Sequence, residues 1–470
     1  MTLWLEWFRC VSLLRPACAR RATFLWMSLV LAGLSVRSDL LGVTSFVRAL
    51  WLKPATYRRL LHFFHSPALS VERLSALWIR LALVLFRPMT HAGRVVFLAD
   101  GLKVPKEGRK MPAVKKLHQG TSADNTKPTF IFGHSFQAVA LLSKGLLGQP
   151  FAVPLSSRIH EGVVFSNRDQ RTLLDKLVAL FLEIVSGSEV SAILVADAFY
   201  ASKKVILPLL VGGHHLITRA RINTTAWQPP SFGAQQHRGR PRIYGEKLRL
   251  RDLFGEKERF VSAMSPVYGE QGIELAYRCL DLVWRPVGRL VRFVLVEHPL
   301  RGRIILLCSD ISLEPLKVIE LYGYRFKIEV GFKQALHTLG SYAYHFWMMD
   351  MTPISRWRSG NQFLHMKSEE YRRHVRRKLA AYHRYVQLAC IAQGLQQHLA
   401  VDFRAKVWDH FKSWMRTMKP HLPPSEAVVA QALRVNLDGF LAAAPQDHEL
   451  REFLLLHIDL DRCPAVVLAG

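Results

Sequence analysis

The sequence predicts an α/β protein in which a mixed β-sheet carries covering helices and is interrupted by a β-rich insertion. Between residues 94 and 221, short apolar runs rich in β-branched residues alternate with segments of helical period. Between residues 222 and 312, alternating strand-like runs replace this pattern. Helical periodicity dominates before residue 90 and again after residue 371.

The order of elements in the α/β region supports a mixed sheet. We expect strands at 94–101, 129–142 and 151–159, a helix at 168–185, a strand at 192–197, a helix at 200–210 and a strand at 214–221. Three early strands followed by alternating helices and strands are typical of a sheet that mixes both strand directions.

The charge of the chain is its most unusual property. The 470 residues include 64 Lys and Arg against 36 Asp and Glu, which gives a net charge of +28. This excess indicates a polyanionic partner, most simply nucleic acid, with an anionic membrane as the alternative. The most apolar run, at residues 24–36, is too short to span a bilayer, and no basic amphipathic helix stands apart from the globular pattern. We therefore expect no membrane partner.

The cysteines and the N-terminus bear on the compartment. The six cysteines are far apart, and no CxxC pair occurs among them. This pattern suggests neither a zinc ribbon nor a disulfide framework, and it fits a reducing compartment. The N-terminal segment lacks the basic start of a signal peptide and carries Glu6. We therefore expect a cytoplasmic protein, associated with the nucleoid through its charge.

Three carboxylates are the candidates for catalysis. Asp100 in VFLADG and Asp197 in ILVADA each end an apolar strand, where a side chain is held at the rim of a sheet. Aspartate also commonly starts a turn, so either residue alone is a weak indication. Together with Glu329 they predict a site for two Mg²⁺ ions, with Mn²⁺ as a substitute, because hard cations prefer oxygen ligands. Two such ions suit phosphoryl transfer.

The segment YGYRFKIEVGFKQAL, residues 322–336, surrounds this glutamate with basic and aromatic residues. At about 100° per residue, Tyr322, Arg325, Glu329 and Lys333 form one stripe of a single helix. A solvated face with i,i+4 ion pairs would have the same pattern. Beside a metal site, Arg325 and Lys333 can instead bind phosphate oxygens, and the Tyr322 hydroxyl can add a hydrogen bond.

Two basic segments predict contacts with a phosphodiester backbone. One is the arm at residues 102–120, although a solvated charge run is an equally good interpretation. The other is RGRPR at residues 238–242, which resembles the core of an AT-hook and is otherwise a basic turn. In these segments we expect DNA contacts from Lys103, Lys106, Lys110, Lys115, Lys116, Arg238, Arg240 and Arg242.

The order Asp100, Asp197, Glu329, with 96 and 131 intervening residues, resembles the DDE transposases of bacterial insertion sequences. More narrowly, it resembles the subgroup defined by Tyr-x2-Arg-x3-Glu-x6-Lys. Tyr322, Arg325 and Glu329 match this motif position by position. Leu336 stands where the motif has lysine, while Lys333 lies one helical turn nearer to the glutamate.

This resemblance implies an RNase H-like catalytic core that a β-rich insertion interrupts before the glutamate. It divides the chain into residues 1–90, a helical and probable DNA-binding head; 91–221, the first part of the core; 222–312, the insertion; 313–370, the second part of the core; and 371–470, a helical region that suits oligomerisation.

The resemblance also implies a function. Such an enzyme binds the terminal inverted repeats of its element and cleaves and joins double-stranded DNA at the element ends and at the target. It works as a homodimer in a synaptic complex and takes no small-molecule substrate. Two alternatives stay open: a catalytically inactive or domesticated relative that only binds DNA, and an RNase H-like nuclease without strand transfer.

Overall fold

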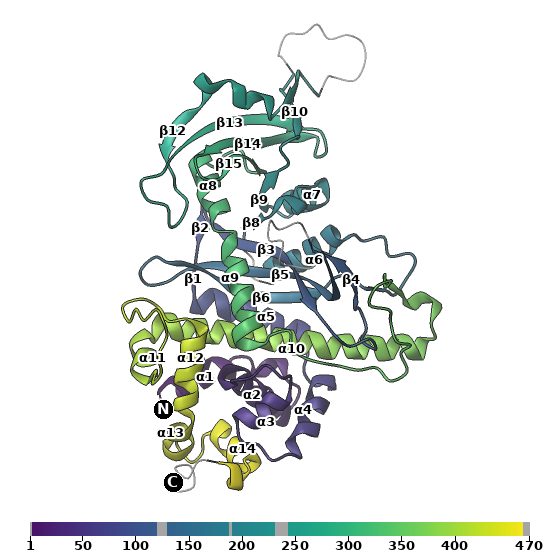
Figure 1. Ribbon diagram of the computed structural model, residues 1–470, viewed down its shortest axis with the longest axis vertical. Coiled ribbons are helices and arrows are strands. Elements are labelled where there is room, and N and C mark those ends of the chain that lie inside the picture. Colours follow the sequence, from purple (N-terminus) through teal and green to yellow (C-terminus); the bar gives the residue numbers. More distant parts are fainter. Residues whose placement is uncertain (1, 120–128, 188–189, 231–242, 464–470) are drawn as a thin grey trace. The chain divides into compact units, whose positions relative to one another are not determined.

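The structure is a computed structural model that describes residues 2–119, 129–187, 190–230 and 243–463 (Figure 1). The chain forms two compact units. We call the unit made of Met1–Pro88, Gly101–Gln170 and Val330–Gly470 the helical unit, and the unit made of Met89–Asp100 and Arg171–Glu329 the sheet unit.

The sheet unit is built on parallel strands. The first part of β3 (Arg94–Pro105), β8 (Ala192–Ala196) and β9 (His215–Ala220) run parallel, with β8 between the other two. All residues of β8 are buried, as expected for a parallel strand that is covered on both faces. These strands lie where the apolar runs predicted them.

The β-rich region extends this same sheet. β15 (Gly302–Cys308) pairs antiparallel with β9, so the insertion is joined edge to edge to the core strands. The sheet then continues through β14 (Arg289–His298), β13 (Glu274–Trp284), β10 (Thr225–Trp227) and β11 (Lys247–Arg249), while β12 (Val261–Met264) pairs with β13 and β2 (Thr90–His91) pairs with β3.

The α-helices in the described residues of the sheet unit are α6 (Leu173–Ser186), α7 (Lys203–Val211), α8 (Pro315–Gly323) and the start of α9 (Phe326–Gln334). α6 begins at a capping box, in which the Thr172 N–H donates to Asp175 Oδ2 at 2.6 Å. Its buried face repeats at helical spacing through Leu177, Phe181 and Ile184.

The prediction of a single helix over residues 322–336 is wrong. α8 ends at Gly323, a turn holds Tyr324 and Arg325, and α9 begins at Phe326. Glycine is a weak helix former, and the Tyr324 N–H closes the last turn of α8 on the Leu321 carbonyl at 3.2 Å. The chain therefore starts a new helix just before Glu329.

The helical unit is organised around α10 (Glu369–Asp402), the long helix in Figure 1. Its other helices are α1 (Thr2–Ser12), α2 (Arg21–Val36), α3 (Thr44–Ala49), α4 (Thr56–His65), α5 (Val71–Leu85), α11 (Arg404–His410), α12 (Glu426–Val435), α13 (Leu437–Ala443) and α14 (Glu449–His457). The predicted helical N- and C-terminal regions are thus confirmed.

The strands of the helical unit are β1 (Arg87–Pro88), the end of β3, β4 (Lys115–His118), β5 (Phe130–Lys144), β6 (Pro150–Ile159), β7 (Val163–Val164) and β16 (Gln362–Phe363). β5 and β6 pair antiparallel and correspond to the second and third predicted strands. β6 packs against α10.

A tight contact fixes this packing. The indole ring of Trp78 in α5 is fully buried, and its Nε1 donates to the Pro154 carbonyl of β6 at 2.9 Å. The ring also lies against Gly394 of α10, where an added Cβ would be 2.2 Å from Cζ2 of the indole. Glycine at position 394 therefore allows α5 to approach the backbone of α10.

Two histidines with lowered pKa values, His134 and His383, are expected to make the helical unit sensitive to acid. His383 Nε2 accepts the Ile159 N–H at 3.2 Å, which requires an unprotonated nitrogen. Burial, helped by the charge of Arg158, lowers the pKa of His383 to about 3. Burial likewise lowers the pKa of His134 to about 3. In the unfolded chain both pKa values are near 6.5.

We therefore expect the contribution of these two histidines to the free energy of unfolding to be fully present above pH 6.5. It should be lost as the pH falls toward 3, because in this range protons bind the unfolded chain and not the folded protein. The loss should approach about 1.4 kcal/mol per pH unit for each histidine. Chemical denaturation between pH 7 and pH 5 measures it. His383→Gln, which keeps an acceptor but does not titrate, should flatten the slope; an unchanged slope would contradict this assignment.

Candidate active site

Strand register brings the two aspartates to the same level. Ala99 of β3 pairs with Ala196 of β8, so Asp100 and Asp197 are the next residues on neighbouring parallel strands. Such strands lie about 4.8 Å apart. Both carboxylates therefore lie just beyond the last paired residues of the two parallel strands. Asp197 follows the end of β8 as predicted, whereas β3 runs on to Pro105, so the prediction that Asp100 ends its strand is wrong.

Short hydrogen bonds hold Asp197 in place. Its Oδ1 accepts the Phe199 N–H at 3.0 Å, which caps a short 3₁₀ turn. Its backbone carbonyl accepts the hydroxyl of Thr218 in β9 at 2.6 Å. Thr218 is fully buried, and it was not among the predicted site residues because a threonine inside a strand carries no distinctive pattern.

Arg325 joins two of the three carboxylates. Its Nη1 lies 3.1 Å from Asp100 Oδ2 and 2.7 Å from Glu329 Oε1. The charge of Arg325 also acts on the Tyr322 hydroxyl and opposes the rise of its pKa. The turn between α8 and α9 therefore keeps Tyr322, Arg325 and Glu329 together, although no single helix connects them.

The charges at this edge influence one another. Burial raises the pKa of Asp197, and the charge of Glu329 adds to this, while the Phe199 N–H and Arg325 oppose it. Burial disfavours the charge of Arg325, but Glu329 and Asp100 outweigh this and raise its pKa. Burial raises the pKa of Tyr322, so its hydroxyl stays protonated. The carboxylates of Asp100, Asp197 and Glu329 thus outnumber the Arg325 guanidinium that lies among them.

These residues fit a divalent metal ion. Carboxylate oxygens are the ligands that hard cations prefer, and a cation near Asp197 would favour its ionised form. Asp100, Asp197 and Glu329 would hold the ion. In the described part of the chain their ligand atoms are not all within 4.8 Å of one another, because Arg325 Nη1 lies between Asp100 and Glu329. Glu329 is half-exposed and stands in the first turn of α9.

The lysine positions of the motif lie further along the same segment. Lys333 stands in the last turn of α9, one turn beyond Glu329. Leu336 lies in the π-helical turn Ala335–Leu339 that follows. The replacement of the motif lysine by Lys333 stays a prediction.

The basic arm is anchored to the helical unit. Its contacts are Lys103 Nζ to the His118 carbonyl at 2.5 Å, Lys110 Nζ to the Met349 carbonyl at 3.1 Å, Lys115 Nζ to Glu161 Oε2 at 2.9 Å, and Lys116 Nζ 4.2 Å from the Phe130 ring centroid. Lys103 is exposed, and Lys110, Lys115 and Lys116 are half-buried. These four lysines stay candidates for DNA contact.

Lys106 departs from the expected pattern. Its side chain is buried, and its Nζ donates to the Tyr342 carbonyl and lies over the Tyr382 ring. Burial lowers its pKa to about 7. Lys106 is therefore a structural lysine, and we remove it from the DNA-contacting set. Arg238, Arg240 and Arg242 lie outside the described residues.

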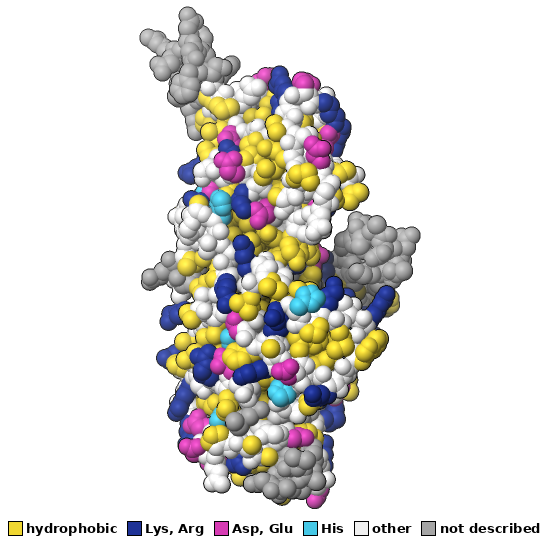
Figure 2. Space-filling view, turned by 90° about the vertical axis from the view of Figure 1, so that its left-hand side faces the viewer, with side chains coloured by type: hydrophobic (Ala, Val, Ile, Leu, Met, Phe, Trp, Pro, Cys, Tyr) yellow, Lys and Arg dark blue, Asp and Glu magenta, His cyan; other side chains and the backbone are white. Residues whose placement is uncertain are grey.

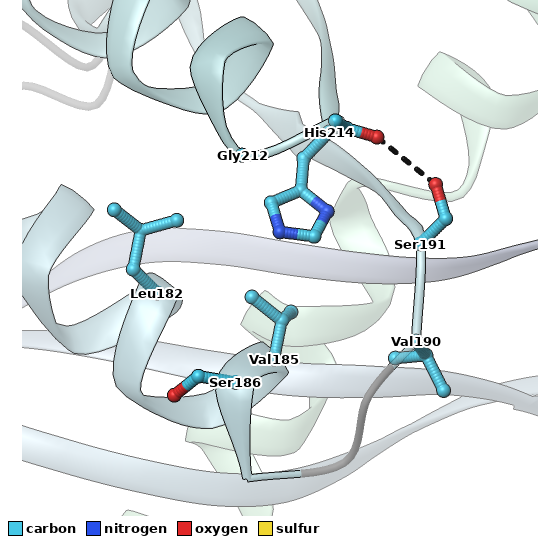
Figure 3. Close-up of a pocket in the computed structure, with 8 residues that line it drawn as sticks. Leu182, Val185, Ser186, Val190, Ser191, Gly212 and His214 are labelled. Atoms are coloured by element: carbon cyan, nitrogen blue, oxygen red, sulfur yellow. Dashed lines mark hydrogen bonds between the residues drawn. The ribbon is translucent and has the colours of Figure 1, made fainter.

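A cavity of about 530 Å³ in the sheet unit is separate from the carboxylates (Figure 3). It lies beside Val190 and Ser191, at the amino end of β8, whereas Asp197 follows the carboxyl end of that strand. Ser191 Oγ donates to the Gly213 carbonyl at 3.0 Å, and burial lowers the pKa of His214 in its wall. The cavity therefore takes no part in the carboxylate site.

Within the described residues, no helix is both long enough and apolar enough to cross a membrane.

Comparison with known proteins agrees with the fold. The family model of the DDE superfamily endonucleases matches residues 14–263, more than half of the chain. The matched range includes Asp100 and Asp197 and ends before Glu329, so the Tyr-Arg-Glu-Lys subgroup stays a prediction. No curated protein matches the chain. The mixed sheet with its helices is the RNase H-like core of such enzymes, and the chain belongs to the DDE superfamily of endonucleases.

Proposed function

We propose that the protein is the transposase of a bacterial insertion sequence, which binds the terminal inverted repeats of its element and cleaves and joins DNA strands. The observation that carries this proposal is the grouping of Asp100 and Glu329 around Arg325, beside Asp197, in a DDE endonuclease. The net charge of +28 supports DNA as the substrate. Figure 2 shows Lys and Arg side chains spread over one face, with fewer acidic side chains among them.

In the proposed mechanism the chain positions the reacting groups. A divalent metal ion, Mg²⁺ or Mn²⁺ in its place, supplies activation of the attacking hydroxyl and stabilisation of the leaving oxygen. Asp100 and Asp197 would hold the ion from the neighbouring strands β3 and β8, and Glu329 would hold it from α9. Arg325 pairs with Asp100 and Glu329 in the free protein, and its planar fork is suited to a phosphate oxygen of DNA.

We further propose a homodimer in a synaptic complex, with the helical residues 1–90 as a DNA-binding head and residues 371–470 as a candidate for the dimer contact. The remaining core boundaries at 91–221, 222–312 and 313–370 belong to the same proposal. Light scattering of the protein with and without a repeat duplex tests it: a mass that stays monomeric on the duplex argues against synapsis.

The decisive experiment uses a labelled duplex that carries the inverted repeats flanking the gene. Purified protein with Mg²⁺ should nick the duplex at the repeat boundary and then join the freed 3′ end to a target DNA. Cutting that ignores the repeats would instead indicate a nuclease without strand transfer. Specific binding without cutting, in Mg²⁺ and in Mn²⁺, would indicate a DNA-binding relative that has lost catalysis.

Two lysines of the arm provide a matched test of DNA contact. Lys103→Ala should weaken DNA binding and lower the slope of log K against log salt by about 0.9, because one phosphate contact is lost. Lys106→Met should leave this slope unchanged and destabilise the protein by about 1 kcal/mol, because the Tyr342 carbonyl loses one of its donors and keeps the Tyr382 hydroxyl. Salt titrations of binding and thermal melting separate the two; an equal loss of slope would place Lys106 on the DNA.

A further inference from the structure

A second group of metal-ligand side chains lies in the helical unit. Glu6 and Cys10 are four residues apart on α1, which places both on one face of that helix. His398 lies on α10, against which α1 packs. Glu6 and His398 are outside the residues matched by the family model, as is Cys10. None of them takes part in the proposed chemistry.

The three side chains converge on one point. Glu6 Oε1 lies 3.0 Å from His398 Nε2 and 3.7 Å from Cys10 Sγ. One ligand atom from each residue lies within 4.8 Å of the other two, and in the described part of the chain this is the only such group of three. Ligands of a tetrahedral zinc ion lie about 3.3–3.8 Å apart, given bonds of 2.0–2.3 Å. Small side-chain movements would therefore complete the site.

The outer side of the histidine also suits a metal site. His398 Nδ1 lies 3.0 Å from Oδ2 of Asp402, one turn further along α10. This contact is close but not aligned as a hydrogen bond, so a small rotation of the buried ring would complete it. Metal-binding histidines commonly present their second nitrogen to a carboxylate in this way, which orients the ring.

Charge and burial agree with this assignment. Cys10 is fully buried, and His398 is buried as well. In the free protein Glu6 is paired with Arg9, whose Nε lies 2.8 Å from Glu6 Oε2. Arg9 also binds the other oxygen, with Nη2 2.6 Å from Glu6 Oε1. Because the Arg9 side chain is mostly exposed, Nη2 can move away and leave Oε1 to a metal ion while Nε keeps Oε2. A thiolate and a carboxylate together balance a divalent charge.

We propose that Glu6, Cys10 and His398 bind a divalent transition-metal ion of the zinc class, which fastens α1 to α10. Thiolate and imidazole ligands select such an ion over Mg²⁺, so this site differs in metal from the carboxylate site. Three protein ligands leave a fourth position for water. Asp402 acts as a positioning residue.

Cobalt(II) is the probe that tests this site in the full-length protein. After treatment with a chelator, the protein should bind equimolar Co²⁺ with a sulfur-to-cobalt charge-transfer band, and Zn²⁺ should displace it. The band reports only cysteine-bound metal, so binding at Asp100, Asp197 and Glu329 does not contribute. The assay needs no DNA, and its failure is therefore distinct from a failure of the proposed transposase activity.

Variants make the test specific. Cys10→Ser should abolish the band, whereas Cys18→Ser, a cysteine whose Sγ contacts Met27 instead, should keep it. His398→Gln, which retains all six cysteines, should also abolish it. Asp402→Asn should weaken Co²⁺ binding about 10- to 100-fold at unchanged stoichiometry. A wild-type protein without the band, or a band that survives in folded His398→Gln, would overturn the proposal.

Discussion

Replacing Asp100 by Asn, Asp197 by Asn or Glu329 by Gln is expected to reduce DNA strand cleavage by about 10³-fold or more. Each change removes a charged ligand of the proposed metal site, and metal stabilisation of the transition state is worth several kcal/mol, at about 1.4 kcal/mol per tenfold in rate. DNA affinity should change little, because none of the three carboxylates attracts phosphate. Single-turnover cleavage of the repeat duplex and a binding titration measure both quantities.

Two controls sharpen this test. Asp252→Asn makes the same change at an exposed aspartate that pairs with Arg251, and it should cleave normally. Arg325→Gln should show the opposite balance, with weaker DNA binding and a smaller salt slope, because its fork contacts phosphate in our proposal. If all three carboxylate variants melt normally and still cut, the active-site assignment is wrong.

Trp78→Ala is expected to lower the free energy of unfolding by about 3–5 kcal/mol. The change empties a fully buried site between α5, β6 and α10 and leaves the Pro154 carbonyl without its indole donor. Denaturation followed by circular dichroism measures the loss in the transition that reports the helical unit. Trp414→Ala is the matched control: its side chain is 77% exposed, and the change should cost at most about 0.5 kcal/mol.

A double-mutant cycle with Gly394 tests the cause of that loss. Gly394→Ala alone should destabilise the protein, because its Cβ would be 2.2 Å from the Trp78 ring. Combined with Trp78→Ala it should become neutral or stabilise by up to about 1 kcal/mol, since alanine is the better helix former. Equal destabilisation in both backgrounds would show that the ring and the glycine are not coupled.

Much of the fold follows from local patterns. The apolar runs at β3, β5, β6, β8 and β9 and the helical period of α6 predict these elements, since period and burial of neighbouring residues are short-range properties. The position of an aspartate at the end of such a run predicts the site edge. The composition alone gives the net charge of +28, which predicts a polyanionic partner such as DNA.

Other features depend on contacts that no local pattern contains. The pairing of β15 with β9 merges the insertion with the core sheet, although separate sheets would have the same alternation. The register of β3 against β8 decides that Asp100 and Asp197 stand level. The turn at Tyr324 and Arg325 replaces the single predicted helix and still leaves Arg325 between two carboxylates.

Charged residues show most clearly which features follow from local sequence and which depend on long-range contacts. The sequence places Lys106 in a basic run, but the carbonyl that accepts its hydrogen bond, that of Tyr342, is 236 positions away. Glu6 and Cys10 have a visible helical spacing, whereas His398 joins them across 392 positions. Local sequence determines which side chains share a strand end or a helix face. Only tertiary packing decides which are buried and which groups meet, because burial and long-range register depend on the whole chain at once.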